Sequence, residues 1–263
     1  MNSEGRFISI TDFTCPEQVN SMLELRKKLN SKILLGVGVM MSYKTLHGFP
    51  TKWSKSFPEN KDIPSIFMDK EGVFNVLHYA DQNNDSCWED FWAGLGYAGP
   101  NVHAIQFDMT WPHPNDVHYV ISSMKEEGAL VEVIMQVGRK SFLQAENTPK
   151  GIIKRLSEYY YRNCLDYVLL DKSMGEGKIL NPHELIPFID AIYQKWPNIK
   201  IVVAGGLGPE TISVAEPILD IYPISLCAQS RLRPSFNALD PIDWDMAQEY
   251  WKKADALFKK YEK

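Results

Sequence analysis

The alternation of short apolar runs with segments of helical period constrains this chain more than any other feature. Eight such runs are rich in β-branched and aromatic residues, and most are apolar throughout. Continuous apolar runs are typical of strands buried on both faces of a parallel sheet. The predicted strands cover residues 7–11, 33–39, 74–78, 102–108, 130–136, 167–171, 199–204 and 224–228.

The segments between these runs carry helix-start signals. Thr14 and Glu17 have the spacing of a capping box, and Thr148-Pro149 and Asn181-Pro182 place a capping side chain before a proline. Eight strands that alternate with helices over roughly 250 residues predict a (β/α)8 TIM barrel. An open doubly wound sheet has the same alternation. The strand count and the length favour a single barrel domain over residues 1–263.

The stretch 40–72 breaks this rhythm. It is rich in lysine, proline, serine and aromatic residues, and it shows little helical period. A compact barrel needs a reason for such a long irregular loop. Two interpretations stay open: this insertion is a lid over the mouth of the barrel, or it is an irregular substitute for the second helix.

Composition and charge exclude several classes of protein. The formal net charge of −5 argues against a nucleic-acid binder, which usually has a basic face. No apolar run approaches the roughly 20 residues that span a membrane, and the polar start of the chain lacks a signal-peptide pattern. The four cysteines are scattered, which favours free thiols in a reducing compartment. We therefore expect a cytoplasmic protein without nucleic-acid or membrane partners.

The active site of a barrel lies where the strands end and the loops to the following helices begin. Many polar side chains occupy these positions in the sequence. They include Thr11, Asp12, His78, Asp81, Gln106, Asp108, Gln136, Arg139, Asp171, Lys172, Ser230 and Arg231. Carboxylates and imidazole suit Mg²⁺, Mn²⁺ or Zn²⁺, so a metal site of Asp12, His78 and Asp108 is one alternative. No compact ligand motif supports it, and we expect no metal and no cofactor.

Two stretches indicate chemistry more specifically. In 204–209, a strand runs into a helix through Gly205 and Gly206, whose bare backbone can approach an anion at a helix N-terminus. The last two strands are also where barrels commonly bind phosphate. In the second stretch, Asp171 ends an apolar strand and is followed by Gly177 and Lys178. Partial burial suits Asp171 to general-acid work, with capping of the loop or pairing with Lys172 or Lys178 as the alternative.

Together these stretches resemble phosphoribosylanthranilate isomerase. The resemblance covers about residues 165–215 and rests on Leu169-Leu170-Asp171, on Gly177-Lys178 and on Ala204-Gly205-Gly206-Leu207. It implies a ribulose-phosphate-binding barrel that performs an Amadori rearrangement of a phosphoribosyl amine. It also implies that the aspartate at 171 is the general acid and that the two glycines bind phosphate. Weaker similarity places 9–14 on the family's first strand and 105–108 on its fourth.

The sequence departs from the family at two positions. Thr11 stands where the family has its catalytic cysteine, and a threonine hydroxyl is too weakly acidic to be the same base. Asp12 is the provisional replacement, with Cys15 at a helix start as a less favoured one. Arg231 stands where the family has a phosphate-site glycine, and it either fills the pocket or clamps the anion.

Three functions follow as hypotheses. The first is an isomerase or lyase of a phosphorylated small molecule, with Asp171 as acid and Asp12 as base. Its expected ligands to substrate and phosphate are Gly205, Gly206, Ser230, Arg231, Gly177, Lys178, Gln106 and Asp108. The second is a non-catalytic phosphate-ligand sensor or interaction protein, favoured by Thr11. The third is the metal-dependent enzyme. The aromatic stripe in 88–95 usually means core packing, and a homodimer surface is the alternative.

Overall fold

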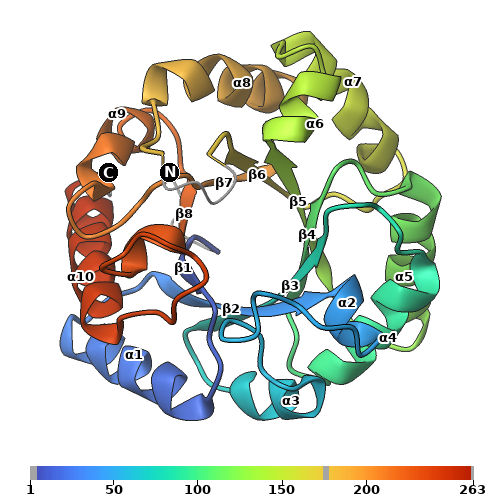
Figure 1. Ribbon diagram of the computed structural model, residues 1–263. Coiled ribbons are helices and arrows are strands. Elements are labelled where there is room, and N and C mark those ends of the chain that lie inside the picture. Colours follow the sequence, from blue (N-terminus) through green and yellow to red (C-terminus); the bar gives the residue numbers. More distant parts are fainter. Residues whose placement is uncertain (1–4, 174–177, 262–263) are drawn as a thin grey trace.

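The computed structural model describes residues 5–173 and 178–261, and it shows a closed barrel. Eight parallel strands follow one another around the barrel in sequence order, and β8 pairs with β1 to close it. Helices form the surrounding ring (Figure 1). The prediction of a (β/α)8 barrel is confirmed, and closure of the sheet excludes the open doubly wound alternative.

The strands agree with the predicted runs to within a few residues. They are β1 (Phe7–Thr11), β2 (Leu34–Ser42), β3 (Val73–Asp81), β4 (Ala104–Met109), β5 (Glu132–Gly138), β6 (Tyr167–Asp171), β7 (Lys200–Val203) and β8 (Ser225–Ala228). The main differences are that β2 and β3 run three residues further than predicted. Residues that were expected after these strands, such as Ser42 and Asp81, therefore lie on them.

Ten α-helices and three short 3₁₀ helices connect the strands within the described residues. They are α1 (Pro16–Lys28), α2 (Tyr43–Leu46), η1 (Asn60–Asp62), α3 (Ile63–Ile66), α4 (Trp88–Ala98), α5 (Pro114–Glu126), α6 (Arg139–Gln144), α7 (Pro149–Tyr160), α8 (Pro182–Lys195), η2 (Ile212–Ala215), α9 (Glu216–Leu219), η3 (Ser230–Leu232) and α10 (Trp244–Tyr261).

The predicted helix starts are confirmed at two places and corrected at a third. Thr148 and Asn181 cap α7 and α8 through their side chains. The cap of α1 is Cys15 instead of Thr14, and the side chain of Gln18 accepts from the Cys15 amide at 3.2 Å to close the box. The cap shifts because the proline at 16 takes the first helical position, where its missing N–H is not needed.

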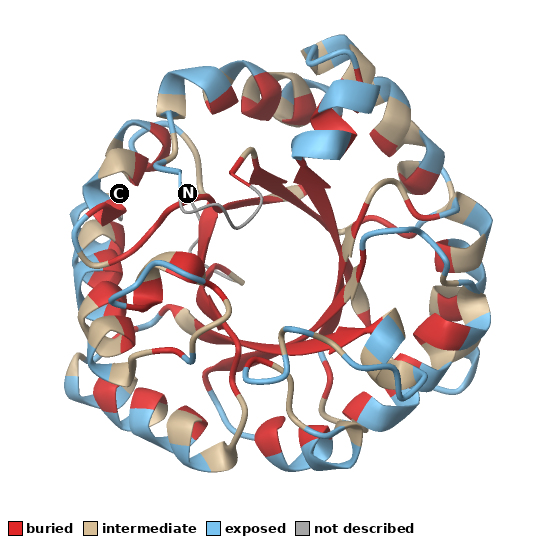
Figure 2. Ribbon diagram, viewed as in Figure 1, coloured by how far each residue is buried: buried red, intermediate tan, exposed pale blue. Residues whose placement is uncertain are grey.

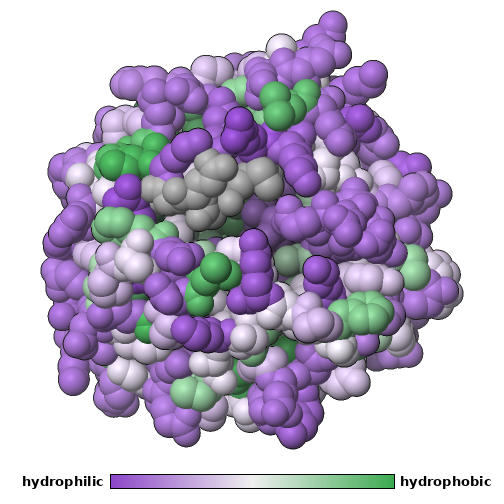
Figure 3. Space-filling view, in the orientation of Figure 1, coloured by the Kyte–Doolittle hydropathy of each residue, from purple (hydrophilic) through white to green (hydrophobic). Residues whose placement is uncertain are grey.

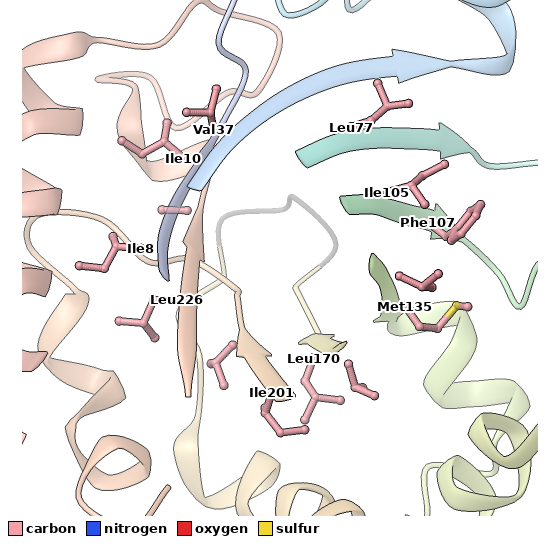
Figure 4. Close-up of a cluster of buried hydrophobic side chains, with 14 of the residues drawn as sticks. Ile8, Ile10, Val37, Leu77, Ile105, Phe107, Met135, Leu170, Ile201 and Leu226 are labelled. Atoms are coloured by element: carbon pink, nitrogen blue, oxygen red, sulfur yellow. The ribbon is translucent and has the colours of Figure 1, made fainter. Parts of the chain in front are cut away.

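Two apolar clusters explain why the strands are hydrophobic on both faces. Successive side chains of a strand point to opposite sides, so one set fills the barrel and the other packs under the helices. The inner cluster includes Phe7, Phe74, Tyr167 and Leu169. Figure 4 shows part of the larger outer cluster around the strands. The strands are buried almost throughout, and exposure is confined to the outer faces of helices and to loops (Figure 2).

The insertion 40–72 contributes to two parts of the barrel. Its first residues extend β2, and residues of the segment 43–57 then line a cavity at the mouth of the barrel. The following α3 contacts both α1 and α4 and takes the place of the missing second helix in the outer ring (Figure 1). The segment 43–57, which contains α2, is called the mouth segment below.

Candidate active site

A cavity of about 650 Å³ lies at the carboxyl ends of the strands. Residues from β1 to β6 and from β8 line it, together with the loops after β7 and β8 and the mouth segment. This is the end at which barrel enzymes build their active sites. The surface around the mouth is largely hydrophilic, as Figure 3 shows. Of the ten residues expected to act on or bind the substrate, six meet at this cavity: Gln106, Asp108, Asp171, Gly205, Gly206 and Ser230.

Asp171 is held at the last position of β6 with 9% of its surface exposed. Its Oδ1 accepts hydrogen bonds from the backbone N–H and from the hydroxyl of Ser173, both at 2.7 Å. The carboxylate therefore caps its loop and faces the cavity at once, so the two interpretations of this residue are not exclusive. Two bonds to one oxygen fix the direction in which the group points, which is what a positioned acid requires.

The turn after β7 is built so that only glycine fits. Gly205 and Gly206 have φ angles of 115° and 58°, which side chains rarely tolerate. A Cβ atom on Gly206 would lie 2.3 Å from the carbonyl oxygen of Lys178, and one on Gly205 would lie 3.2 Å from Asp171 Oδ1. Among the described residues, the N–H groups of these glycines make no hydrogen bond to a backbone carbonyl. They are thus suited to an anion in the cavity.

Two other predicted ligands do not line the cavity. Arg231 places its guanidinium carbon 4.8 Å from the ring centre of Phe236 and packs its Cβ against Gly208. Lys178 is exposed and meets the glycine turn through its backbone carbonyl. Neither is among the described residues around the cavity, and Gly177 lies outside the described residues. Ser230, by contrast, is buried at the start of η3 and lines the cavity.

Asp12, the provisional base, is engaged elsewhere. It is 3% exposed, has a φ of 81° and forms an ion pair with Arg233, which is completely buried. Gln229 donates to the other carboxylate oxygen at 3.0 Å. Arg233 also donates to the backbone carbonyls of Gln229 and Asp240. Asp12 is not among the residues that line the cavity, so it acts in the structure as the partner of a buried cation.

Cys227 on β8 lines the cavity beside Thr11, with its Sγ 3.5 Å from the threonine hydroxyl. Closure of the barrel thus brings a thiol next to the position at which the family resemblance implies a cysteine. Burial raises the pKa of Cys227 to about 11, so it is a neutral thiol near pH 7. Partial burial also raises the pKa of Cys15, contrary to the lowering expected at a helix start. Neither thiol is therefore a ready base.

Alkylation tests whether Cys227 is a buried, neutral thiol. Only the thiolate attacks iodoacetamide, and an unperturbed cysteine has a pKa of about 8.5, so we expect native Cys227 to be labelled more than about a hundredfold slower than in the unfolded chain. Mass spectrometry of peptides from native and urea-unfolded protein at pH 7 measures both rates. Equal rates would contradict burial of the thiol.

A ring of polar side chains forms the β3–β5 wall of the cavity. Gln106 Nε2 lies 3.2 Å from His78 Nδ1 and donates to Gln136 Oε1 at 2.7 Å. Gln136 Nε2 donates to Asp108 Oδ1 at 2.9 Å, and Asp108 Oδ2 lies 3.4 Å from His78 Nε2. Sequence reasoning placed all four residues at strand ends. It did not predict that they bond to one another.

The alternative of a metal site formed by Asp12, His78 and Asp108 is not supported. Among the described residues, no group of three or more histidine, cysteine, aspartate or glutamate side chains is placed to hold a metal ion. His78 and Asp108 are neighbours, but Asp12 is turned away into its pair with Arg233. Asp12 lies just beyond the end of β1, and its carboxylate bonds to Arg233 and Gln229 instead.

The mouth segment adds aromatic and cationic side chains to the cavity. Trp53, Phe57, Lys44 and Lys52 all line it. The Lys52 ammonium lies 5.2 Å from the ring centre of Trp53, which is within the range of a cation–π interaction. In α4, Phe91 and Leu95 are buried in the core, which confirms the core interpretation for these two residues, whereas Trp88 and Trp92 are half-buried.

Comparison with solved structures agrees with the barrel fold, whereas two other comparisons find no match. No family model and no curated protein matches the chain. Solved structures do match it. One is a truncated 3-deoxy-D-arabino-heptulosonate 7-phosphate synthase from Thermotoga maritima, with 12% identity, coverage of 98% and 88% of the two chains and a TM-score of 0.54. Another is an HMG-CoA lyase from Brucella melitensis, with 10% identity, coverage of 97% and 99% and a TM-score of 0.54.

A third match is a Chromobacterium violaceum protein assigned provisionally to spore coat polysaccharide biosynthesis. It is 9% identical, with coverage of 98% of this chain and 76% of that one and a TM-score of 0.60. At such identities the likeness shows a shared TIM-barrel fold.

None of the helices in the described part of the chain is long and apolar enough to cross a membrane.

Proposed function

We propose that this protein is a barrel enzyme, an isomerase or lyase, that acts on a phosphorylated small molecule. The phosphate would sit on the turn of Gly205 and Gly206, next to Ser230, and Asp171 would serve as general acid. The proposal rests on the closeness of the Asp171 carboxylate to the glycine turn. A Cβ atom on Gly205 would lie 3.2 Å from Asp171 Oδ1. An anion on this turn would therefore place the rest of its molecule within reach of Asp171.

The strict isomerase activity implied by the family resemblance is the less supported version. That reaction needs a base near β1, and Asp12 is paired with Arg233 while Cys227 is held as a thiol. The same observation favours a second candidate, a phosphate-ligand sensor that binds in this cavity without turnover. The two candidates share the phosphate site and differ in whether replacing Asp171 abolishes a reaction.

Inorganic phosphate tests the shared site. Phosphate should raise the melting temperature of the protein more than chloride at equal ionic strength, because a ligand that binds only the folded state stabilises it. Gly206→Ala should weaken phosphate binding at least about tenfold, since a charge-assisted hydrogen bond is worth roughly 1.5–3 kcal/mol and its donor must move. Titration calorimetry measures the affinities.

Gly96→Ala is the matched control, because a Cβ there meets nothing within 4 Å and the residue is exposed on α4. This variant should bind phosphate as the unmodified protein does. Equal effects of phosphate and chloride on the unmodified protein would count against the site.

A further inference from the structure

The polar ring on β3–β5 fixes the direction of every hydrogen bond within it. The carboxylate of Asp108 can only accept, so Gln136 must present its Nε2 to it. The Oε1 of Gln136 then faces Gln106, which must in turn present its own Nε2. That same Nε2 lies against His78 Nδ1. His78 Nδ1 is therefore the acceptor, and the proton of the neutral imidazole is on Nε2.

The opposite orientation is strongly disfavoured. A proton on Nδ1 would require Gln106 to turn its Oε1 toward His78, which would set that oxygen against Gln136 Oε1. Reversing Gln136 as well would direct an amide oxygen at the Asp108 carboxylate. Each arrangement brings two acceptors together in a mostly buried place, where the cost of an unpaired polar group is greatest. The carboxylate thus sets the tautomer of a histidine through two amides.

Within 5–173 and 178–261, no group forms a hydrogen bond with His78 Nε2. The residue is 6% exposed and lines the cavity, and its Nε2 is buried without a hydrogen bond. Asp108 Oδ2 is 3.4 Å away, but the geometry between the two atoms is not that of a hydrogen bond. Among the described residues, Oδ2 also accepts no hydrogen bond. A directed donor and an available acceptor therefore stand side by side on one wall.

We propose that His78 and Asp108 form a binding site for hydroxyl groups of the substrate. A hydroxyl can both accept and donate hydrogen bonds. It can therefore accept one from His78 Nε2–H and donate one to Asp108 Oδ2. The same pair fits adjacent carbonyl and hydroxyl oxygens. This inference rests on the proposed function for the other end of the ligand. The ring stands on β3–β5 and the glycine turn follows β7, across the barrel. The structure thus assigns a polyhydroxylated phosphate ester to the cavity.

The tautomer can be tested without any ligand. Imidazole ¹⁵N chemical shifts, recorded above the usual titration range of histidine and assigned with His78→Gln, should show the proton on Nε2. Gln106→Glu replaces the donor with an acceptor of the same shape, so the single proton of the neutral His78 ring should then move to Nδ1. An unmodified protein with the proton on Nδ1 would overturn the proposal.

A matched pair of ligands tests the binding role. Ribitol 5-phosphate carries hydroxyls along a five-carbon chain, and n-pentyl phosphate has the same length without them. Ribitol 5-phosphate should bind at least about tenfold more tightly, the equivalent of one charge-assisted hydrogen bond. His78→Phe and Asp108→Asn should reduce this preference. His78→Gln, which keeps an acceptor for Gln106 and a donor for the cavity, should preserve it.

Asp85→Asn is the control, because Asp85 also lines the cavity but is not part of the ring. This variant should keep the preference for ribitol 5-phosphate. Equal affinity of the unmodified protein for the two compounds would overturn the hydroxyl site and leave the phosphate site standing. If neither compound binds and inorganic phosphate also fails to bind, both proposals fall.

Discussion

Arg233→Met is expected to destabilise the protein by about 3–5 kcal/mol, the usual cost of removing one partner from a buried ion pair. Arg233 is completely buried and Asp12 nearly so, and the guanidinium also satisfies two backbone carbonyls between β8 and α10. Methionine fills a similar volume but leaves a buried carboxylate without its cation. Urea unfolding followed by circular dichroism measures the loss.

Two further variants separate this effect from a general loss of packing. Arg231→Met changes the arginine two positions earlier, which is half-buried against Phe236, and should cost much less. Adding Asp12→Asn to Arg233→Met removes the unpaired charge and should restore part of the stability. If the double variant were no more stable than Arg233→Met, the ion pair would not be the cause.

Asp171→Asn is expected to lower turnover about 10²–10⁴-fold, the range that a positioned general acid contributes. Asparagine keeps the shape and an acceptor oxygen for Ser173, but it has no proton to give to a leaving oxygen. Affinity for phosphate should change little, because the amide replaces only the acid. The substrate for the assay is the sugar phosphate or phosphorylated heterocycle that most raises the melting temperature, and steady-state kinetics give kcat and KM.

Asp85→Asn again provides the comparison, since it removes a carboxylate from the same cavity at a position exposed to solvent. Its kcat should stay within a few-fold of the unmodified protein. Retention of kcat by Asp171→Asn would contradict the acid role. No turnover with any compound in the screen, together with tight binding of one, would favour the sensor.

Local pattern was enough to predict the framework. The run 167–171 coincides with β6, and Thr148 and Asn181 cap the helices that their sequence indicates. Periodicity and capping act between residues close in the chain, so they are readable without the fold. The insertion 40–72 was less readable because its short helices have no extended apolar face. The place of α3 in the outer ring depends on its contacts with α1 and α4, which form only in the folded barrel.

A barrel with polar strand ends and a glycine turn suited to an anion can be predicted from the order of the residues. Which of the polar side chains face the cavity depends on how the barrel closes. Asp12 meets Arg233 across 221 positions and Thr11 meets Cys227 across 216, because closure of the barrel sets β8 beside β1. The partner of a buried charge depends on such distant contacts, and alternation along the strands cannot reveal it. For that reason Asp12 is an ion-pair partner, while His78 and Asp108 face the cavity.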